Sequence, residues 1–240
     1  MLLQSKYSIP EAPMQALPRA HLRSLIDQST KSVTTVVASA GYGKTTLVAG
    51  WAHEQDDPVA WYSLDISDNE AALFNRYLVE SLNQATANAL PNAAEMVESG
   101  NIQNCIAVMT TIISDLKRLP FKLHCVFEDI HAITNQEIRT AINLLIKYLP
   151  AGVHLVFSSR SEPRFNFASL RMRGELTEVF ELDLSLTPDE VATFTQQRLP
   201  FKLSPAQISH LTQLSEGWAP VVQLFCLSAK SQGECDSLLE

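Results

Sequence analysis

A glycine-rich stretch with one lysine and two threonines is the part of the sequence most suited to chemistry. It lies within Ser32–Leu47, which reads SVTTVVASAGYGKTTL. The β-branched residues at its start predict a strand over Val33–Val37, and a helix is expected to begin near Lys44. The first N–H groups of a helix have no partner within the helix, so here they would face the intervening loop. This arrangement predicts a binding site for a polyphosphate.

The residues of this loop have separate expected roles. Lys44 would reach the β- and γ-phosphates as a mobile charge, and the Thr45 hydroxyl would coordinate Mg²⁺. Gly41 and Gly43 let the backbone approach an anion without an intervening Cβ. Ala38 stands where the G-x-x-x-x-G-K-[ST] pattern has its first glycine. The predicted nucleotide-binding residues of the loop are Ala38, Ser39, Ala40, Gly41, Tyr42, Gly43, Lys44, Thr45 and Thr46.

Two further predicted strands end in charged residues. The apolar run Leu123–Phe127 is followed by Glu128 and Asp129, and Val153–Phe157 leads to Arg160. Nucleotide hydrolysis needs a second metal partner and a group that orients the attacking water, and the acidic pair can supply both. Glu128 occupies the usual place of the Mg²⁺-binding aspartate, so the division of roles within the pair stays open. Arg160 would contact the γ-phosphate.

Three other polar residues remain ambiguous from the sequence. His131 follows the acidic pair and is interpreted as a structural residue in preference to a catalytic one. Asp65 and Asp68 lie in a polar turn after a predicted strand, where they could either line the γ-phosphate side or only form the turn.

Apolar strands alternate with amphipathic helices along most of the chain. Val59–Leu64 reads as a further strand, and apolar residues from Ile138 to Leu149 recur at helical spacing. Such alternation predicts an α/β fold of the P-loop NTPase kind, with a mostly parallel central sheet flanked by helices. In such sheets, ligands bind at the carboxyl ends of the strands.

The pattern changes after about residue 170. Apolar residues at every second position of 180–186 predict a half-buried strand. Two capping boxes, which begin at Thr187 and Ser204, then predict helices with proline in the first turn. We therefore expect a nucleotide-binding domain over 1–172 and a small helical domain over 173–240.

Composition narrows the function classes. The chain has 240 residues, a formal net charge of -8 and no Lys/Arg cluster, which argues against its binding a nucleic-acid backbone by itself. No apolar run is long enough to span a bilayer, and the N-terminus does not have the pattern of a signal peptide, so we expect a cytoplasmic protein. The four cysteines form no C-x-x-C pair and are expected to be reduced thiols.

Several motifs in a fixed order resemble one family. The sequence is similar to the N-terminal nucleotide-binding region of MalT-type activators of maltose genes. These activators belong to the signal-transduction ATPases with numerous domains and to the large ATP-binding LuxR-type regulators. The motifs that carry the resemblance are SKYSIP at 5–10, ASAGYGKTTL at 38–47, WYSLDISDN at 61–69, VFEDIHAITN at 126–135, LVFSSR at 155–160, LRMRGELTE at 170–178 and SEGWAPVVQL at 215–224.

The resemblance implies a nucleotide-driven switch. In such proteins the ATP-bound form self-associates and activates transcription, hydrolysis to ADP resets it, and inhibitory protein partners can hold it inactive. It also implies that Pro220, in the G-x-P motif, lies against adenine, and that Pro18 and Arg19 border the base. No sensor or DNA-binding segment fits in this length. We therefore expect the N-terminal region of a longer regulator that binds DNA only through a C-terminal domain outside this chain.

Two other functions stay open at this point. One is a nucleotide-dependent small-molecule kinase, although no arginine-rich lid follows the helices. The other is a module that binds ATP or ADP without hydrolysing it, which the glutamate at position 128 makes tenable.

Overall fold

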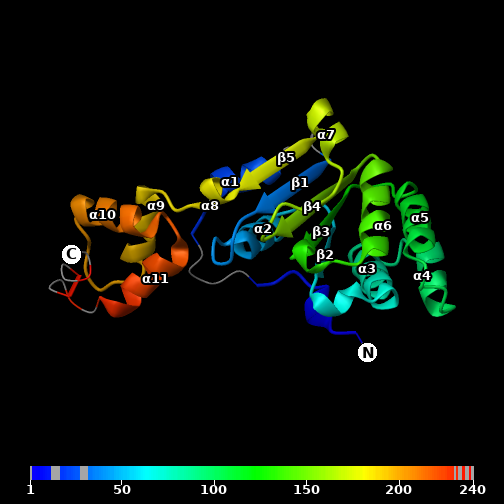
Figure 1. Cartoon of the computed structure of the whole chain (residues 1–240), viewed down its shortest axis with the longest axis horizontal. Coiled ribbons are helices and arrows are strands. Elements are labelled where there is room, and N and C mark those ends of the chain that lie inside the picture. The colour runs from blue at the N-terminus through cyan, green and yellow to red at the C-terminus, as the bar shows by residue number, and fades with distance from the viewer. Residues whose placement is uncertain are drawn as a thin grey trace.

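A five-stranded parallel sheet forms the centre of the described structure (Figure 1). The computed structural model describes residues 2–11, 17–27, 32–229, 231, 234–235 and 238. Along the sheet the strands follow the order β2-β3-β4-β1-β5, and every pairing is parallel. The strands are β1 (Val33–Val37), β2 (Val59–Ser63), β3 (Leu123–Glu128), β4 (Val153–Ser159) and β5 (Leu176–Phe180). The predicted fold class, an α/β protein with a parallel central sheet, is confirmed.

Helices cover both faces of this sheet, and its strands are therefore buried on both sides. One face carries α3 (Ala71–Ala85), α4 (Pro91–Glu98), α5 (Cys105–Leu116) and α6 (Gln136–Lys147). The other carries α1 (Ala20–Ile26) and α2 (Lys44–Ala52). Short elements complete this part of the chain: η1 (Gln4–Lys6), η2 (Ile66–Asn69), η3 (Ile130–Ala132) and α7 (Ala168–Arg173).

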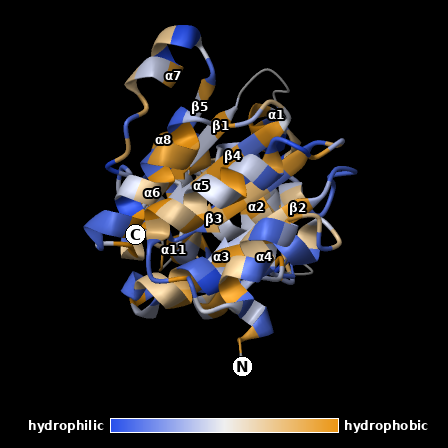
Figure 2. Ribbon diagram, turned by 90° about the vertical axis from the view of Figure 1, so that its right-hand side faces the viewer, coloured by the Kyte–Doolittle hydropathy of each residue, from blue (hydrophilic) through white to orange (hydrophobic). Residues whose placement is uncertain are grey.

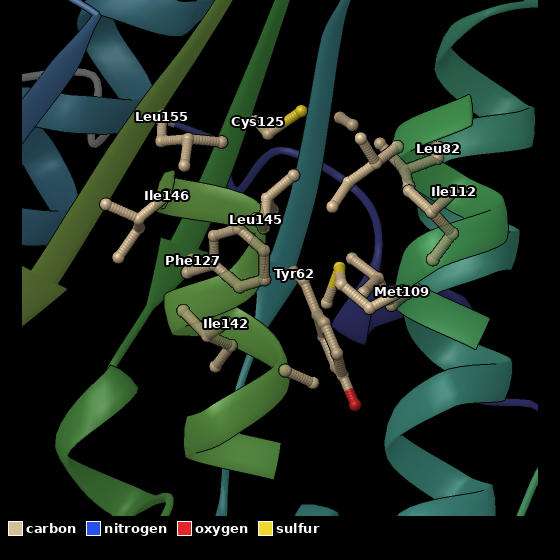
Figure 3. Packing of buried hydrophobic residues seen from close by; sticks show 14 of the residues in the cluster. Tyr62, Leu82, Met109, Ile112, Cys125, Phe127, Ile142, Leu145, Ile146 and Leu155 are labelled. Carbon is tan, nitrogen blue, oxygen red and sulfur yellow. The ribbon is translucent and has the colours of Figure 1, made fainter. Parts of the chain in front are cut away.

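Alternate residues of each strand belong to different halves of the core. Cys125 and Phe127 of β3 pack toward α3, α5 and α6, whereas Val126 between them packs toward α1 and α2. Figure 3 shows the first of these clusters, where Tyr62 and Phe127 from the strands meet apolar side chains of α5 and α6. Figure 2 shows the hydrophobic residues concentrated on the strands and on the helices packed around them. The sheet is therefore held rigidly from both sides.

A third apolar cluster lies in the C-terminal helices, apart from the sheet. After α8 (Glu181–Leu184) come α9 (Pro188–Gln196), α10 (Pro205–Ser215) and α11 (Ala219–Ser228). Val191, Leu211 and Val222 are buried among these last three helices. Figure 1 shows them beyond α8, at the end toward which the strands point. The predicted capping boxes at Thr187 and Ser204 are present.

One sequence prediction in this region is wrong. Residues 180–186 do not form a strand: β5 ends at Phe180, and Glu181–Leu184 is the helix α8. The Asp183 carboxylate accepts a hydrogen bond from the Phe180 N–H and caps this helix, and Leu182 is 88% exposed. β5 also extends the sheet beyond residue 172, the predicted end of the nucleotide-binding domain. The division into two domains stays a prediction.

Candidate functional site

The loop between β1 and α2 presents a run of free backbone donors. Gly41 and Gly43 have φ values of 87° and 78°, in the left-handed region that favours glycine. Within the described residues, the N–H groups of residues 40–46 donate to no backbone or side-chain acceptor. These groups belong to the loop and to the first turn of α2, where the helix dipole favours an anion. The loop therefore has the donors that a polyphosphate requires.

Lys44 lies within this loop. Its ammonium group donates to the carbonyl oxygens of Ala38 at 2.7 Å and of Ser39 at 3.0 Å, and the residue is only 7% exposed. Burial lowers the pKa of Lys44, and Arg160 lowers it further, whereas Asp129 and Glu128 act in the opposite direction. Asp129, Glu128 and Arg160 are therefore close enough to Lys44 to act on its charge.

Glu128 is the last residue of β3 and is 6% exposed. One of its carboxylate oxygens accepts a hydrogen bond from the Ser63 hydroxyl at 2.9 Å, and Ser63 in turn accepts one from the Trp61 indole N–H at 2.8 Å. Both partners lie on β2, the strand next to β3. The other carboxylate oxygen accepts from no described residue. Glu128 is therefore fixed in orientation while one oxygen stays available to a ligand.

Asp129 and Arg160 flank His131. Asp129 has a φ of 54°, an uncommon left-handed conformation for a residue other than glycine. The His131 Nδ1 atom lies 3.6 Å from an Asp129 carboxylate oxygen and accepts a hydrogen bond from the Arg160 backbone N–H at 3.4 Å. Burial lowers the pKa of His131, and the Asp129 carboxylate opposes this shift. His131 thus joins the ends of β3 and β4, in keeping with a structural role.

The residues fit a magnesium–nucleotide complex. Mg²⁺ in such sites takes few protein ligands and keeps phosphate oxygens and waters around it. Thr45 is exposed at the start of α2, and its hydroxyl makes no hydrogen bond to a described residue. The free oxygen of Glu128 is the second candidate ligand. Among the described residues no group of three or more His, Cys, Asp or Glu side chains could hold a metal alone. A metal here would therefore depend on the nucleotide.

The structure resolves the ambiguity of Asp65 and Asp68. Asp68 is fully buried and accepts hydrogen bonds from Lys6 at 2.5 Å and from the Tyr62 hydroxyl at 2.9 Å. Asp65 caps η2 by accepting from the Ser67 N–H, and it also contacts Lys6 at 3.0 Å. Both acids hold the N-terminal segment and the turn after β2.

The residues expected around the adenine have different surroundings. The Arg19 guanidinium donates to the Glu190 carboxylate at 2.8 Å and to the carbonyl oxygens of Leu184 and Ser185. Its hydrogen bonds within the described residues thus tie the N-terminal segment to α8 and α9. Pro18 is exposed beside it. Pro220 contacts the loop directly, because a Cβ built on Gly41 would lie 2.6 Å from its Cγ. The role of these three residues at the base stays a prediction.

Sequence reasoning misses two residues that touch the loop. The Glu181 carboxylate accepts a hydrogen bond from the Ser39 N–H at 2.8 Å, and this bond, more than any other contact, holds the pKa of Glu181 below its usual range. The Trp218 indole N–H donates to the Ala40 carbonyl at 3.1 Å. The alternating pattern assigns Glu181 to a strand that does not form, and Trp218 lies within the sequence GWAP at 217–220, whose proline is the expected contact. The loop therefore carries contacts from both α8 and the turn before α11.

Two cavities lie away from the loop. One of about 310 Å³ is next to the end of β4 and is lined by His131, Arg139 and Arg164. A larger one of about 520 Å³ lies at the amino ends of the strands, where His124 and His154 face each other with their Nδ1 atoms 3.1 Å apart. Burial lowers the pKa of His154 to about 4, so this histidine is neutral at pH 7. None of the residues predicted to bind nucleotide or metal lines this larger cavity.

Comparison with curated proteins confirms the resemblance expected from the motifs. The chain is 30% identical over 233 residues to the HTH-type transcriptional regulator MalT of Vibrio cholerae, which covers 97% of this chain. It is 32% identical over 231 residues to MalT of Cronobacter sakazakii, which covers 96%. In both cases the match spans 26% of the relative, so the chain corresponds to about a quarter of these regulators. No family model matches the chain.

Solved structures share the fold at much lower sequence identity. A signal transduction ATPase with numerous domains and a tetratricopeptide repeat sensor, from Pyrococcus horikoshii, superposes with a TM-score of 0.64 at 14% identity. That match covers 96% of this chain and 33% of the other. A Walker-type ATPase from Pyrococcus abyssi gives a TM-score of 0.58 at 10% identity, covering 96% and 73%. At such identities the likeness supports the P-loop NTPase fold alone.

No helix in the described part of the chain is both long and apolar enough to cross a bilayer.

Proposed function

We propose that this chain is the ATP- and ADP-binding switch region of a transcriptional activator similar to MalT. The observation that carries the proposal is the run of free N–H groups at residues 40–46, with the Lys44 ammonium among them. Donors in this arrangement suit the phosphates of a nucleotide, and Thr45 and Glu128 fit Mg²⁺ bound to those phosphates. The similarity to MalT over nearly the whole chain supports the regulatory context.

The proposed enzymatic activity is slow ATP hydrolysis. Mg²⁺ bound with ATP would neutralise charge on the phosphates, and the residues of this chain would hold and position the reactants. Lys44 would bind the phosphates, and Asp129 or Glu128 would orient the attacking water. Arg160 would contact the γ-phosphate from the end of β4. Hydrolysis to ADP would remove the contact with Arg160 and return the protein to its resting form.

In the longer regulator, the ATP-bound form would self-associate and activate transcription. Self-association, inhibitory protein partners and DNA binding through another domain all enter from the similarity to MalT. The acidic balance of this chain, with a net charge of -8, agrees with a DNA contact made elsewhere.

One alternative is favoured by a specific contact. Glu128 is oriented by the Ser63 hydroxyl and is almost fully buried. A glutamate held in this way could bind the metal without activating water, which would leave a module that binds nucleotide but does not hydrolyse it. Phosphate release from the purified chain separates the two functions.

The proposal is tested by Lys44→Ala, with Lys117→Ala as the matched control. Lys117 is exposed at the end of α5, so its loss removes an equal charge away from the loop. We expect Lys44→Ala to abolish tight ATP binding in calorimetry while its thermal unfolding stays close to that of the parent. The Lys117 variant should bind as the parent does. ATP binding by Lys44→Ala with the affinity of the parent would reject the phosphate site.

A further inference from the structure

The turn between α10 and α11 lies directly on the phosphate loop, although the two are far apart in sequence. The Trp218 indole N–H donates to the Ala40 carbonyl at 3.1 Å. The Trp218 and Tyr42 rings lie with their centroids 6.4 Å apart. A Cβ added at Gly41 would come within 2.6 Å of Pro220 Cγ and 2.8 Å of Trp218 Nε1. The loop and the turn are therefore in van der Waals contact as well as hydrogen-bonded.

The backbone around Trp218 is fixed by the C-terminal helices and not by the loop. Gly217 has a φ of 72°, and a Cβ there would lie 2.7 Å from the Leu186 carbonyl oxygen. The Gly217 carbonyl accepts a hydrogen bond from the Leu186 N–H at 2.8 Å, and the Trp218 N–H donates to Ser215 at 2.8 Å. Because the backbone is held in this way, only the two side-chain torsions of Trp218 remain free. The backbone thus places the indole where its N–H can reach the loop.

Holding the Ala40 carbonyl also holds a donor of the loop. The peptide bond between Ala40 and Gly41 is planar and trans, so its C=O and N–H groups point in opposite directions. A hydrogen bond that fixes the Ala40 carbonyl therefore fixes the direction of the Gly41 N–H. That N–H donates to no described residue and belongs to the run proposed to bind phosphate. Glycine has wide backbone freedom, so the peptide would otherwise rotate readily.

We propose that Trp218 is a positioning residue for the phosphate loop. Its indole N–H orients the peptide between residues 40 and 41, so the loop presents the Gly41 N–H to an anion only while the C-terminal helices are docked. Trp218 acts through the backbone of the loop and therefore affects ATP and ADP to a similar degree. This effect differs from that of Arg160, which is expected to separate the two nucleotides.

The first test measures nucleotide affinity and rests on the proposed function. Trp218→Phe keeps an aromatic ring and removes the N–H, whereas Trp218→Leu removes both. One hydrogen bond of this kind corresponds to a loss of about 3- to 10-fold in affinity, expected equally for ATP and ADP in Trp218→Phe. The matched control is Trp51→Phe, which removes an indole N–H bond to Asp27 at the other end of α2. That variant should bind both nucleotides as the parent does.

The second test needs no nucleotide. Trp51 and Trp61 are each 1% exposed, whereas Trp218 is 37% exposed, so iodide quenching of tryptophan fluorescence reports mainly on Trp218. Gly41→Ala places a methyl group against Pro220 and Trp218, whereas Gly43→Ala meets nothing within 4 Å. Both substitutions strain a residue with positive φ to a similar degree. We expect iodide quenching to rise in Gly41→Ala and to stay at the parent level in Gly43→Ala.

The outcomes distinguish a failure of the proposed nucleotide-binding function from a failure of the positioning role of Trp218. A parent chain that binds neither nucleotide would reject the proposed function, while the quenching comparison would still test the contact between the turn and the loop. If the parent binds both nucleotides and Trp218→Phe binds them equally well, the positioning role is overturned. Equal quenching in the two glycine variants would also overturn it. A lower midpoint of thermal unfolding for Trp218→Phe with unchanged affinity would identify a purely structural residue and reject the proposal.

Discussion

Two acidic clusters follow neighbouring strands of the sheet, and their surroundings are opposite. Asp68, after β2, is fully buried and has a donor for each carboxylate oxygen, from Lys6 and from Tyr62. Glu128 and Asp129, at the end of β3, have few partners: Ser63 holds one oxygen of Glu128, and His131 lies 3.6 Å from Asp129. A carboxylate whose oxygens are satisfied is part of the framework. One with a free oxygen beside a phosphate loop is available to a ligand.

Substitutions in the cluster after β3 should slow ATP hydrolysis strongly, whereas a substitution in the cluster after β2 should not. Glu128→Gln and Asp129→Ala should each retain ATP and slow hydrolysis by about 10²–10⁴-fold, because the loop donors remain while metal charge or water orientation is lost. Single-turnover phosphate release measures the rate, and calorimetry measures ATP affinity. Asp65→Ala, which removes an acid after the neighbouring strand, is the control and should hydrolyse ATP as the parent does. Unchanged phosphate release in both variants at the end of β3 would exclude this pair from the mechanism.

The next prediction compares the contributions of Asp68 and Asp65, the two acids after β2, to stability. Asp68→Ala leaves the Lys6 ammonium and the Tyr62 hydroxyl without their buried acceptor, which should lower the free energy of unfolding by about 3 kcal/mol. Asp65→Ala removes the more exposed partner of the same lysine and a cap of η2, so its cost should be about 1 kcal/mol. Denaturant unfolding of both variants tests this order. Equal losses would show that burial does not distinguish the two acids.

The sequence was sufficient to predict the strand, the glycine-containing loop and the start of the helix in this stretch, because the signals for these elements are local. The β-branched run, the glycines and the lysine lie within Ser32–Leu47; β1 spans the expected residues, and α2 begins at Lys44 as expected. The distinction between Asp68 and Glu128 was out of reach, since it depends on Lys6, 62 residues before Asp68. A pattern within one turn carries no information about so distant a partner.

The failure at α8 has a different physical cause. Apolar residues at every second position of 180–186 have the period of a strand, but two of them are not core residues: Phe180 is 46% and Leu182 is 88% exposed. Leu184 and Leu186 are buried in two different apolar clusters. The alternation therefore did not mark one buried face, and the cap by Asp183 decided the local structure. The same error hid Glu181 as a residue that contacts the loop.

A smaller effect is expected for Arg160, which lies at the end of β4 beside the predicted ligand site. Arg160 is exposed, and its side chain forms no hydrogen bond to a described residue. Arg160→Ala should reduce the preference for ATP over ADP by about tenfold, since a hydrogen bond to a charged group contributes on the order of 1.5 kcal/mol. ADP affinity should change little. Arg164→Ala, which alters another arginine beside the neighbouring cavity, is the control. Titrations that give the same ATP-to-ADP ratio for Arg160→Ala and the parent would contradict the γ-phosphate contact.

The smallest effect concerns the charge of Asp65. The Ser67 hydroxyl, together with Lys6, holds the pKa of Asp65 below its usual range in spite of partial burial. A carboxyl group with a lowered pKa stabilises the folded state above its unfolded-state pKa, about 3.9, and this contribution disappears as the pH falls through the folded-state pKa. The difference in unfolding free energy between the parent and Asp65→Asn should therefore stay constant from pH 7 to about 4 and shrink at lower pH. For a half-exposed pair it should be below about 1 kcal/mol.

Removing the lysine provides the control for this pH dependence. In a Lys6→Met background the pKa of Asp65 should move back toward its usual range, because one of the two groups that lower it is gone. The change in unfolding free energy caused by Asp65→Asn should then be smaller at neutral pH, and its loss on acidification should be complete at a higher pH. A change that is identical with and without Lys6 would mean that the lysine stabilises only the buried Asp68. In that case the exposed acid of this cluster would act through its cap on η2 alone, and the contrast with the β3 end would rest on Asp68.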